Sequence, residues 1–507
     1  MRCFVLLAVV FANCLCAAAG AQAAEPSQAP SVSDTPEQWR SLARQDLDAA
    51  REVLASQTPI PFDDVNPVYR KWLDQGYAQA RVLADQVTDA QGLYYTIAYY
   101  LHGFADPHIS ANPVGELPAP LWPGFIVASR AGEVVVKYRD ESDPTVPPLG
   151  ARVVGCDERT LDELIAQRLY PYVLNRKLEL DRRRAPTRLF LERGIPAAPA
   201  PVRCRFFFDG REREIDLRYR DLPQPTETYW TMFTAAYAGP SAAWGISEPA
   251  PGVFWVGVPT FASGSTTAPK LTTLTEEISR RAAAMRKGRA IVVDIRGNAG
   301  GNSMWANRIA DAIFSKQLAA TANKSSASQV SIDWRASVEN IAYWEGVLET
   351  MRGEFGALAP NTLGVRRVIS RLKGALGDDP PIWHEGQREP SVGGGLSERR
   401  PQGHSPFPAQ VFVLSNGTCA SSCLNFLDTA LFIPGVRLIG AATGADGPYM
   451  EVRSVNLPSG RVRMTIPQKV QRGNPRAAME AYQPDVTYDG SWDDAAIREW
   501  VIERVSR

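Results

Sequence analysis

The sequence lacks a net charge and, after residue 25, any long apolar run. Its 507 residues include 55 Lys and Arg against 55 Asp and Glu, so the formal net charge is zero. A protein that attracts nucleic acid through its overall field needs a positive excess, and we therefore expect no nucleic-acid partner. A membrane-spanning helix needs about 20 apolar residues, so we also expect no stable membrane insertion of the main body of the chain.

The residues that are present make up a folded protein of several domains. Hydrophobic residues account for 45% and charged residues for 22% of the chain, which excludes a disordered or collagen-like protein. At roughly 150 residues per domain, the length suggests about three domains. The sequence therefore predicts a multi-domain protein of enzyme size.

The first residues have the pattern of a secretory signal. A short cationic start, Met1–Arg2, precedes an apolar run from Phe4 to about Ala19, and Ala21–Ala23 has the A-x-A form that signal peptidase cuts. A membrane anchor is the alternative, but the apolar core is short and small residues follow it. We expect residues 1–23 to be a signal peptide and the mature chain to be periplasmic or secreted.

Cysteine is scarce, and export to an oxidising compartment would favour disulfide formation. Of seven cysteines, four remain in the mature chain: Cys156, Cys204, Cys419 and Cys423. Neighbourhood in the sequence favours Cys156–Cys204 as a disulfide of one domain. For Cys419 and Cys423, a local bridge and two buried thiols both stay open, because the spacing is near the upper end of disulfide reach. The pairs lack C-x-x-C spacing, which disfavours zinc, so we expect no metal and no cofactor.

Three blocks of sequence pattern predict the domain organisation. Residues 24–112 have apolar positions at three- and four-residue spacing, which indicates helices. Residues 113–222 contain short β-rich runs and one helix, and residues 223–507 alternate strands and helices as an α/β domain does. Within this last block, residues 318–406 resemble an insertion.

Particular runs mark the elements of the last two blocks. The β-rich runs of the middle block are 124–127, 133–137, 151–154 and 204–208; the α/β block has buried strands at 253–258, 290–295 and 411–414, and helices near 270–286, 303–316 and 421–432. Leu149–Asp157 followed by Leu161 resembles the second half of a PDZ domain, with Trp122–Phe125 as a loop that binds a peptide carboxylate. A plain β-domain is the alternative.

A glycine-rich string follows the predicted strand 290–295. Asp294–Gly301 reads DIRGNAGG, with three glycines in its last five positions. Glycine lets the backbone approach a ligand closely with its N–H groups exposed. No Lys-Ser/Thr follows Gly301 and the spacing is not G-x-G-x-x-G, so a phosphate loop is disfavoured. A simple tight turn stays open.

A serine-rich string lies between another predicted strand and a helix. Ser415–Cys423 reads SNGTCASSC. A serine at a strand-to-helix turn projects its hydroxyl into a cleft, where the helix N-terminus supplies N–H groups and a positive dipole end. The alternative is that Thr418, Ser421 and Ser422 only cap the helix.

Together, the two strings resemble those of the tail-specific, or C-terminal processing, serine peptidases and their tricorn-type relatives. The order of helical region, PDZ-like domain and α/β domain of the crotonase/Clp type is also similar. The resemblance implies that Ser421 is the nucleophile. It also implies an oxyanion hole made by the N–H of Ser422 and one from Gly300 or Gly301.

One position departs from the Ser-Lys branch of that family. The position 25 residues after Ser421, where that branch carries a lysine base, is Asp446. A carboxylate does not replace a neutral amine without a strong shift of its pKa. The sequence is therefore closer to the tricorn-type branch, which uses a histidine and a distant glutamate.

Candidates for both residues exist. The four histidines are His102, His108, His384 and His404, and Asp106-Pro107-His108 resembles the Asp-x-His string that carries the base in the tricorn-type branch. Glu480 lies 59 residues after Ser421 and shortly before Pro484-Asp485, where the resemblance implies the third member of a triad. Glu480 would orient His108 and stabilise its imidazolium form.

The sequence predicts an exported serine endopeptidase that acts on protein or peptide substrates. A catalytically silent relative that binds a peptide or an apolar ligand in the same cleft is the alternative. An esterase of another fold is disfavoured because the G-x-S-x-G elbow is missing.

Overall fold

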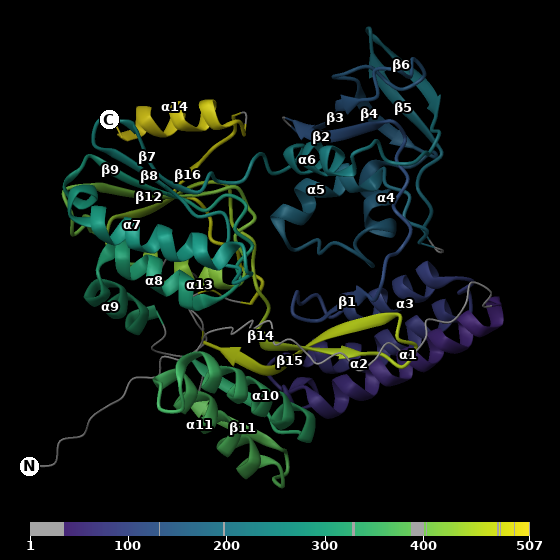
Figure 1. Cartoon of the computed structure of the whole chain (residues 1–507). Helices are drawn as coiled ribbons and strands as arrows, with labels where there is room; N and C mark the ends of the chain where they lie inside the picture. The colour runs from purple at the N-terminus through teal and green to yellow at the C-terminus, as the bar shows by residue number, and fades with distance from the viewer. Residues whose placement is uncertain are drawn as a thin grey trace, which may run out of the picture. The chain divides into compact units, whose positions relative to one another are not determined.

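The computed structural model describes residues 35–505 apart from 131, 196–197, 327–329, 387–399, 402, 474–475, 477 and 491 (Figure 1). The predicted signal peptide and the glycine run at 393–395 lie outside the described residues. The chain divides into two compact units. One contains Ser241–Val452 and Gln468–Arg507, and the other contains the described residues before Ser241 together with Arg453–Pro467. None of the described helices is long and apolar enough to cross a bilayer.

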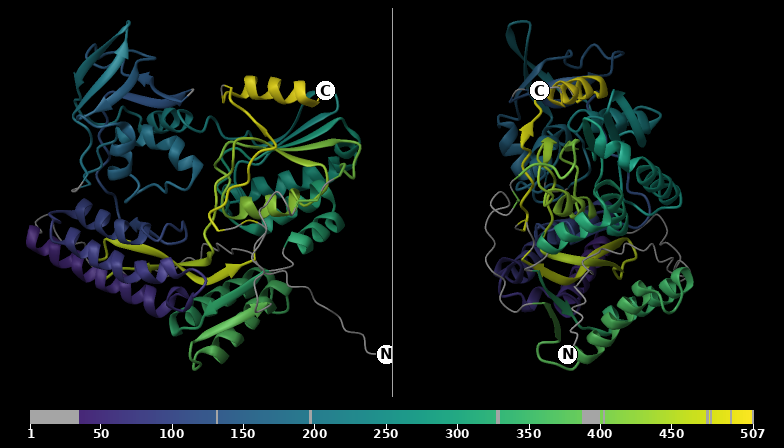
Figure 2. Two further views of the ribbon diagram at one scale, coloured as in Figure 1. Left: turned by 180° about the vertical axis from the view of Figure 1, so that it is seen from behind. Right: turned by 90° about the vertical axis from the view of Figure 1, so that its left-hand side faces the viewer.

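Three helices begin the second of these units, as the sequence pattern predicts, and they pack side by side (Figure 2). They are α1 (Pro36–Gln57), α2 (Pro67–Ala84) and α3 (Ala90–His102), with the short 3-10 turn η1 (Ile60–Phe62) after α1. Thr35 starts α1 through a capping box with Gln38, and the Asp89 carboxylate caps α3 by accepting the Gly92 N–H. The apolar stripes face each other, so that Leu47, Leu54 and Leu101 are fully buried.

A five-stranded antiparallel sheet forms the β-rich part of the same unit. Its strands, in order, are β2 (Phe125–Arg130), β3 (Glu133–Arg139), β4 (Arg152–Cys156), β5 (Arg203–Phe208) and β6 (Arg211–Asp216), and its helices are α4 (Leu161–Arg168), α5 (Glu179–Leu189) and α6 (Thr226–Ala235). Along β5, Cys204 and Phe206 are buried while Arg203 and Arg205 are exposed, which is the alternation of a sheet with one covered face. The four predicted β-rich runs are confirmed.

Cys156 and Cys204 are direct cross-strand partners of β4 and β5 and form a disulfide. The predicted bridge is confirmed.

Replacing both residues by Ala opens a loop with a sequence separation of 48. In the chain-entropy model this removes about 4 kcal/mol of stability. We expect a lower unfolding midpoint in urea for the double variant. An unchanged midpoint would contradict a stabilising role for this disulfide.

A six-stranded sheet forms the centre of the other unit, in the order β16-β13-β12-β9-β8-β7. All neighbours are parallel except the edge strand β7. The strands are β7 (Gly245–Ala250), β8 (Val253–Gly257), β9 (Ala290–Asp294), β12 (Gln410–Ser415), β13 (Val436–Gly440) and β16 (Val486–Thr487). The three strands predicted for this block are confirmed as β8, β9 and β12.

Helices cover both faces of this sheet (Figure 1). The helices α7 (Thr267–Lys287), α8 (Ser303–Phe314), α9 (Lys316–Ser326) and α13 (Ser422–Ala430) bury one face, and α14 (Asp494–Val505) covers the other. Alternate residues of β12 show this division: Val411 and Val413 pack with the first group, and Phe412 and Leu414 pack with α14. Burial on both faces explains the nearly continuous apolar runs of these strands.

The segment predicted as an insertion carries its own small core. It contains β10 (Ser331–Arg335), α10 (Val338–Phe355), α11 (Pro360–Ala375) and β11 (Ile382–Gly386), and Trp334, Trp344 and Leu372 are buried among them. β10 pairs with the second half of β15 (Val462–Arg472), which follows β14 (Tyr449–Asn456). The first half of β15 pairs with β1 (Ser110–Pro113).

Candidate active site

The glycine-rich string begins at the end of β9, where Asp294 and Arg296 form a buried ion pair. The Arg296 guanidinium bonds the Asp294 carboxylate at 2.7 Å and also bonds Asp494. The indole N–H of Trp255 donates to Asp294 at 3.0 Å, so Asp294 is held from both sides. Burial lowers the pKa of Arg296, but hydrogen bonds and charge interactions with Asp294 and Asp494 outweigh this and raise it overall. The base of the loop is therefore fixed.

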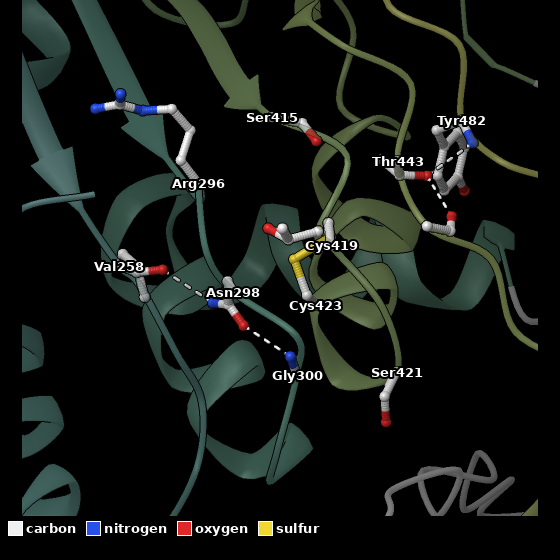
Figure 3. Close-up of a disulfide and its surroundings, with 12 residues drawn as sticks. Val258, Arg296, Asn298, Gly300, Ser415, Cys419, Ser421, Cys423, Thr443 and Tyr482 are labelled. Carbon is white, nitrogen blue, oxygen red and sulfur yellow. Dashed lines mark hydrogen bonds between the residues drawn. A yellow bond between two sulfur atoms is a disulfide. The ribbon is translucent and has the colours of Figure 1, made fainter. Parts of the chain in front are cut away.

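Beyond Arg296, the loop is joined to the serine string. The Gly297 N–H donates to Thr418 Oγ1 at 2.8 Å. The Asn298 side chain donates to the Val258 carbonyl at 2.9 Å, and its Oδ1 accepts the Gly300 N–H at 2.9 Å (Figure 3). These bonds fix both the position of the loop and the direction of the Gly300 amide.

Gly300 lies directly against the turn at Ser421. Its φ is +97°, and a Cβ there would lie 2.6 Å from the Ala420 carbonyl oxygen and 2.8 Å from Ser421 Cβ. Only glycine satisfies both conditions. The string is therefore more than a tight turn, because its backbone forms one wall of the serine site.

Gly300→Ala is expected to push the Ser421 turn out of place. We expect at least a tenfold loss of reaction with a serine-directed fluorophosphonate, since displacement of about 1 Å at a reacting group costs up to about 100-fold. Gly346→Ala is the control, because Gly346 lies within α10 and a Cβ there meets nothing within 4 Å. Equal reaction rates in the two variants would contradict the close packing of Gly300 on Ser421.

Ser421 sits at the N-terminus of α13 in a conformation that L-residues rarely adopt. Its φ is 53° and its ψ is −129°, and its side chain makes no capping hydrogen bond. Among the described residues its hydroxyl has no hydrogen-bond partner. Strain of this kind costs about 1–3 kcal/mol and gathers at functional sites.

The neighbouring hydroxyls do not cap the helix either. Thr418 Oγ1 donates to Asn416 Oδ1 at 2.7 Å, and Ser422 Oγ is buried without a hydrogen-bond partner in the described part of the chain. The interpretation of the string as a set of capping residues is therefore wrong. Ser421 is partly exposed at this turn, whereas Ser422 is fully buried.

A disulfide joins Cys419 to Cys423 and brackets Ser421. Both cysteines are fully buried, and the Ser421 side chain points away from the bridge (Figure 3). Of the two possibilities left open by the sequence, the structure has the bridge. It ties the residues on either side of Ser421 together and so restrains the turn.

Two backbone N–H groups beside Ser421 have no acceptor among the described residues, those of Ser422 and Gly301. A Cβ on Gly300 would lie 3.0 Å from the Ser422 nitrogen, so the glycine loop and the start of α13 are in contact here. The Gly300 amide, by contrast, donates to Asn298. Of the two glycines considered for the second donor, Gly301 is the one whose amide remains available in this structure.

Asp446 lies beneath the serine turn. Its Oδ1 accepts the Ser421 N–H at 3.0 Å, and its Oδ2 is 3.5 Å from Arg476 Nη2. Arg476 also pairs with Asp428 at 3.3 Å, and the Tyr482 hydroxyl donates to Asp428 at 2.7 Å. The sequence analysis noted Asp446 only as the residue that stands where the Ser-Lys branch carries its lysine base, and it did not identify Arg476. No local sequence pattern places either residue beside Ser421.

Glu480 belongs to a segment docked on the loop that carries Asp446. The Met479 N–H donates to the Asp446 carbonyl at 2.8 Å. Two bonds of 3.0 Å join Tyr482 to Thr443: the Thr443 N–H donates to the Tyr482 carbonyl, and the Tyr482 N–H donates to Thr443 Oγ1 (Figure 3). Glu480 lies between these anchors, is partly buried and is in the same unit as Ser421.

His108 follows α3 in the other unit, and a buried carboxylate orients it. Asp106 Oδ1 accepts the His108 backbone N–H at 2.9 Å and lies 3.2 Å from His108 Nδ1. Asp106 is only 3% exposed. Asp106 is part of the Asp-x-His string, but the sequence analysis assigned a function only to His108.

Two of the other histidines, His102 and His384, and Asp485 have different partners. His102 ends α3, where its Nε2 is 2.7 Å from the Leu174 carbonyl oxygen and burial lowers its pKa. His384 Nδ1 lies 2.6 Å from Asp333. Asp485 is bound by Arg400 and by the Leu438 N–H. Across the described ranges, no group of three His, Cys, Asp or Glu side chains is arranged to hold a metal.

Comparison with known proteins gives the class. The profile described as peptidase family S41 matches residues 254–488, the stretch that holds the glycine loop, Ser421 and Glu480. Mature CPAF is similar in structure, with a TM-score of 0.56 and 13% identity over 92% of this chain and 98% of CPAF. A CPAF mutant gives 0.57, with 12% identity over 92% and 98%. No curated protein matches at the level of sequence.

These findings define a serine peptidase. Residues 254–488 match the profile of peptidase family S41, in agreement with the resemblance that the two sequence strings show. The likeness to CPAF, at 13% identity, establishes a shared fold.

Proposed function

We propose that the protein is an exported, periplasmic or secreted endopeptidase of the tricorn-type branch, which cleaves proteins or peptides through an acyl-enzyme on Ser421. The observation that carries the proposal is the Ser421 turn. Its backbone is strained, bracketed by a disulfide and packed on Gly300 at the positive end of α13. A merely structural serine needs none of these features.

In this mechanism His108 is the general base. It takes the proton of Ser421 as the hydroxyl attacks the peptide carbonyl, and then gives that proton to the leaving amine. The N–H groups of Ser422 and Gly301 stabilise the developing oxyanion. A water, deprotonated by the same histidine, hydrolyses the ester and regenerates Ser421.

Two carboxylates are candidates for orienting the base. Asp106 is bonded to His108 in the structure, and Glu480 is the residue that the family resemblance assigns. We assign the imidazolium-stabilising role to Glu480 and the fixing of the ring to Asp106. The remaining parts of the proposal are a PDZ-like role in peptide binding for residues 113–222 and a crotonase/Clp-type fold for the α/β domain.

A catalytically silent binding protein is the second candidate. The observation in its favour is that Asp446 replaces the lysine of the Ser-Lys branch and that its carboxylate is engaged by the Ser421 amide and Arg476. Fluorophosphonate labelling separates the two functions. Labelling of the wild type but not of Ser421→Ala supports the peptidase, and absence of labelling in both supports the binding protein.

A further inference from the structure

The strained Ser421 turn needs a group that keeps it in place. With a φ of 53° and a ψ of −129°, the Ser421 backbone lies in a strained region that residues with a side chain rarely adopt. The φ angle describes rotation about the N–Cα bond of Ser421, and the Ser421 N–H lies at one end of that bond. A hydrogen bond to that amide therefore restrains the conformation that exposes the hydroxyl.

The acceptor of that amide is the carboxylate of Asp446, at 3.0 Å, and Asp446 is only 2% exposed. The Asp446 carboxylate bonds the backbone of Ser421, while the Ser421 hydroxyl makes no bond to it. A general base must reach the proton that it removes. Asp446 therefore lies at the sequence position of the lysine base, but its carboxylate is not placed to remove the proton of the Ser421 hydroxyl.

A buried carboxylate also needs a partner for its charge. Arg476, 3% exposed, lies 3.5 Å from Asp446 and 3.3 Å from Asp428. Burial lowers the pKa of Arg476, but the charges of Asp428 and Asp446 outweigh it and raise the pKa overall. One guanidinium thus holds two carboxylates, and the N-terminus of α13 adds a favourable dipole for Asp446.

We infer that Asp446, held by Arg476, is a positioning residue that keeps Ser421 in its reactive conformation through the Ser421 backbone amide. The inference rests on the proposed peptidase function for its effect on rate, but not for its effect on the turn. Asp446 takes up no proton in the reaction. Its removal should lower kcat and leave substrate binding nearly unchanged.

The test compares three substitutions at one position. Asp446→Ala removes the acceptor, Asp446→Asn retains an oxygen that accepts the Ser421 N–H, and Asp446→Lys introduces the residue of the Ser-Lys branch. Asp333→Asn is the matched control, because the partners of Asp333 are Arg472 and His384 and neither of them belongs to residues 416–426. Each variant is measured by peptide hydrolysis and by hydrogen exchange of residues 416–426.

We expect Asp446→Ala to lower kcat by about 10- to 100-fold with KM changed less than about threefold, as for a displaced reacting group. The kcat of Asp446→Asn should be within about fivefold of the wild-type value, and the kcat of Asp446→Lys should not exceed that of Asp446→Ala. Exchange over residues 416–426 should quicken about tenfold in Asp446→Ala and stay unchanged in Asp333→Asn.

The two readouts separate the inference from the proposed function. Unchanged exchange in Asp446→Ala overturns the inference whether or not the protein is a peptidase. Faster exchange in Asp446→Ala, together with a wild type that neither hydrolyses nor labels, supports the positioning and overturns the peptidase. A rate increase in Asp446→Lys, or a change in KM alone, also overturns the inference. If Asp446→Ala does not fold, Arg476→Lys replaces it, with an expected loss in kcat of about three- to tenfold.

Discussion

Replacing Ser421 by Ala is expected to abolish peptide hydrolysis while leaving the fold intact. The side chain is partly exposed and its hydroxyl has no partner among the described residues, so removing it breaks no contact that stabilises the domain. Loss of a positioned nucleophile typically costs several orders of magnitude in rate. The measurement is steady-state hydrolysis of a protein substrate such as casein, with thermal unfolding of both proteins as the control.

The threshold for this prediction follows from the size of the barrier. A variant that keeps more than about a tenth of the wild-type rate has lost less than about 1.4 kcal/mol of transition-state stabilisation. Such a result would refute Ser421 as the nucleophile. Ser422→Ala is the matched control, because its buried hydroxyl has no hydrogen-bond partner in the described chain, and its backbone N–H is retained.

His108→Ala should cause the second large loss, and a larger one than Glu480→Gln. The base takes part in every proton transfer, whereas an orienting carboxylate contributes through the base. We expect a drop of at least about 1000-fold for His108→Ala and a smaller one for Glu480→Gln. The measurement is kcat/KM for each variant with one peptide substrate.

Asp106→Asn provides the comparison for Glu480→Gln. The side-chain amide of this variant would keep an oxygen near the His108 backbone N–H but lose the charge beside Nδ1. If Glu480→Gln costs more than His108→Ala, the assignment of base and orienting group is wrong. If Asp106→Asn costs more than Glu480→Gln, Asp106 holds the third role. Asp485 is not a candidate, since Arg400 and the Leu438 N–H already bind it.

The sequence predicted those parts of the site that depend on local pattern. Three glycines after a buried strand and a serine before a helix were visible because strand, turn and helix each have a short-range signal. The resemblance of these two strings to the tail-specific and tricorn-type peptidases then implied Ser421 and Gly300 as site residues, and the structure places them in contact. The expected peptidase class came from the same resemblance.

What the sequence did not predict depends on contacts between distant segments. The bond from Asp446 to the Ser421 amide and the pairing of Arg476 with two carboxylates join segments that have no shared periodicity. Whether Gly300 or Gly301 keeps a free amide depends on the side chain of Asn298. The Cys419–Cys423 bridge was left open because an ordinary helical turn holds such a pair near the limit of disulfide reach.

The fold shows the same division. The strands β8, β9 and β12 were predicted from continuous apolar runs, whereas β14 and the long β15 were not identified. Along β15, positions such as Arg463 and Lys469 are charged, and besides its sequence neighbour β14 it pairs with β1 and β10, which are distant in sequence. A strand stabilised by such long-range pairing leaves a weak local pattern.

The most direct test of the central claim is to identify the residue that a fluorophosphonate modifies. The protein is treated with the probe, digested without reduction, and mapped by mass spectrometry. The account predicts one adduct, on Ser421, within a peptide that also contains the Cys419–Cys423 disulfide. It further predicts that the adduct forms far more slowly in His108→Ala. An adduct on any other residue, or no adduct on the folded wild-type protein, would contradict it.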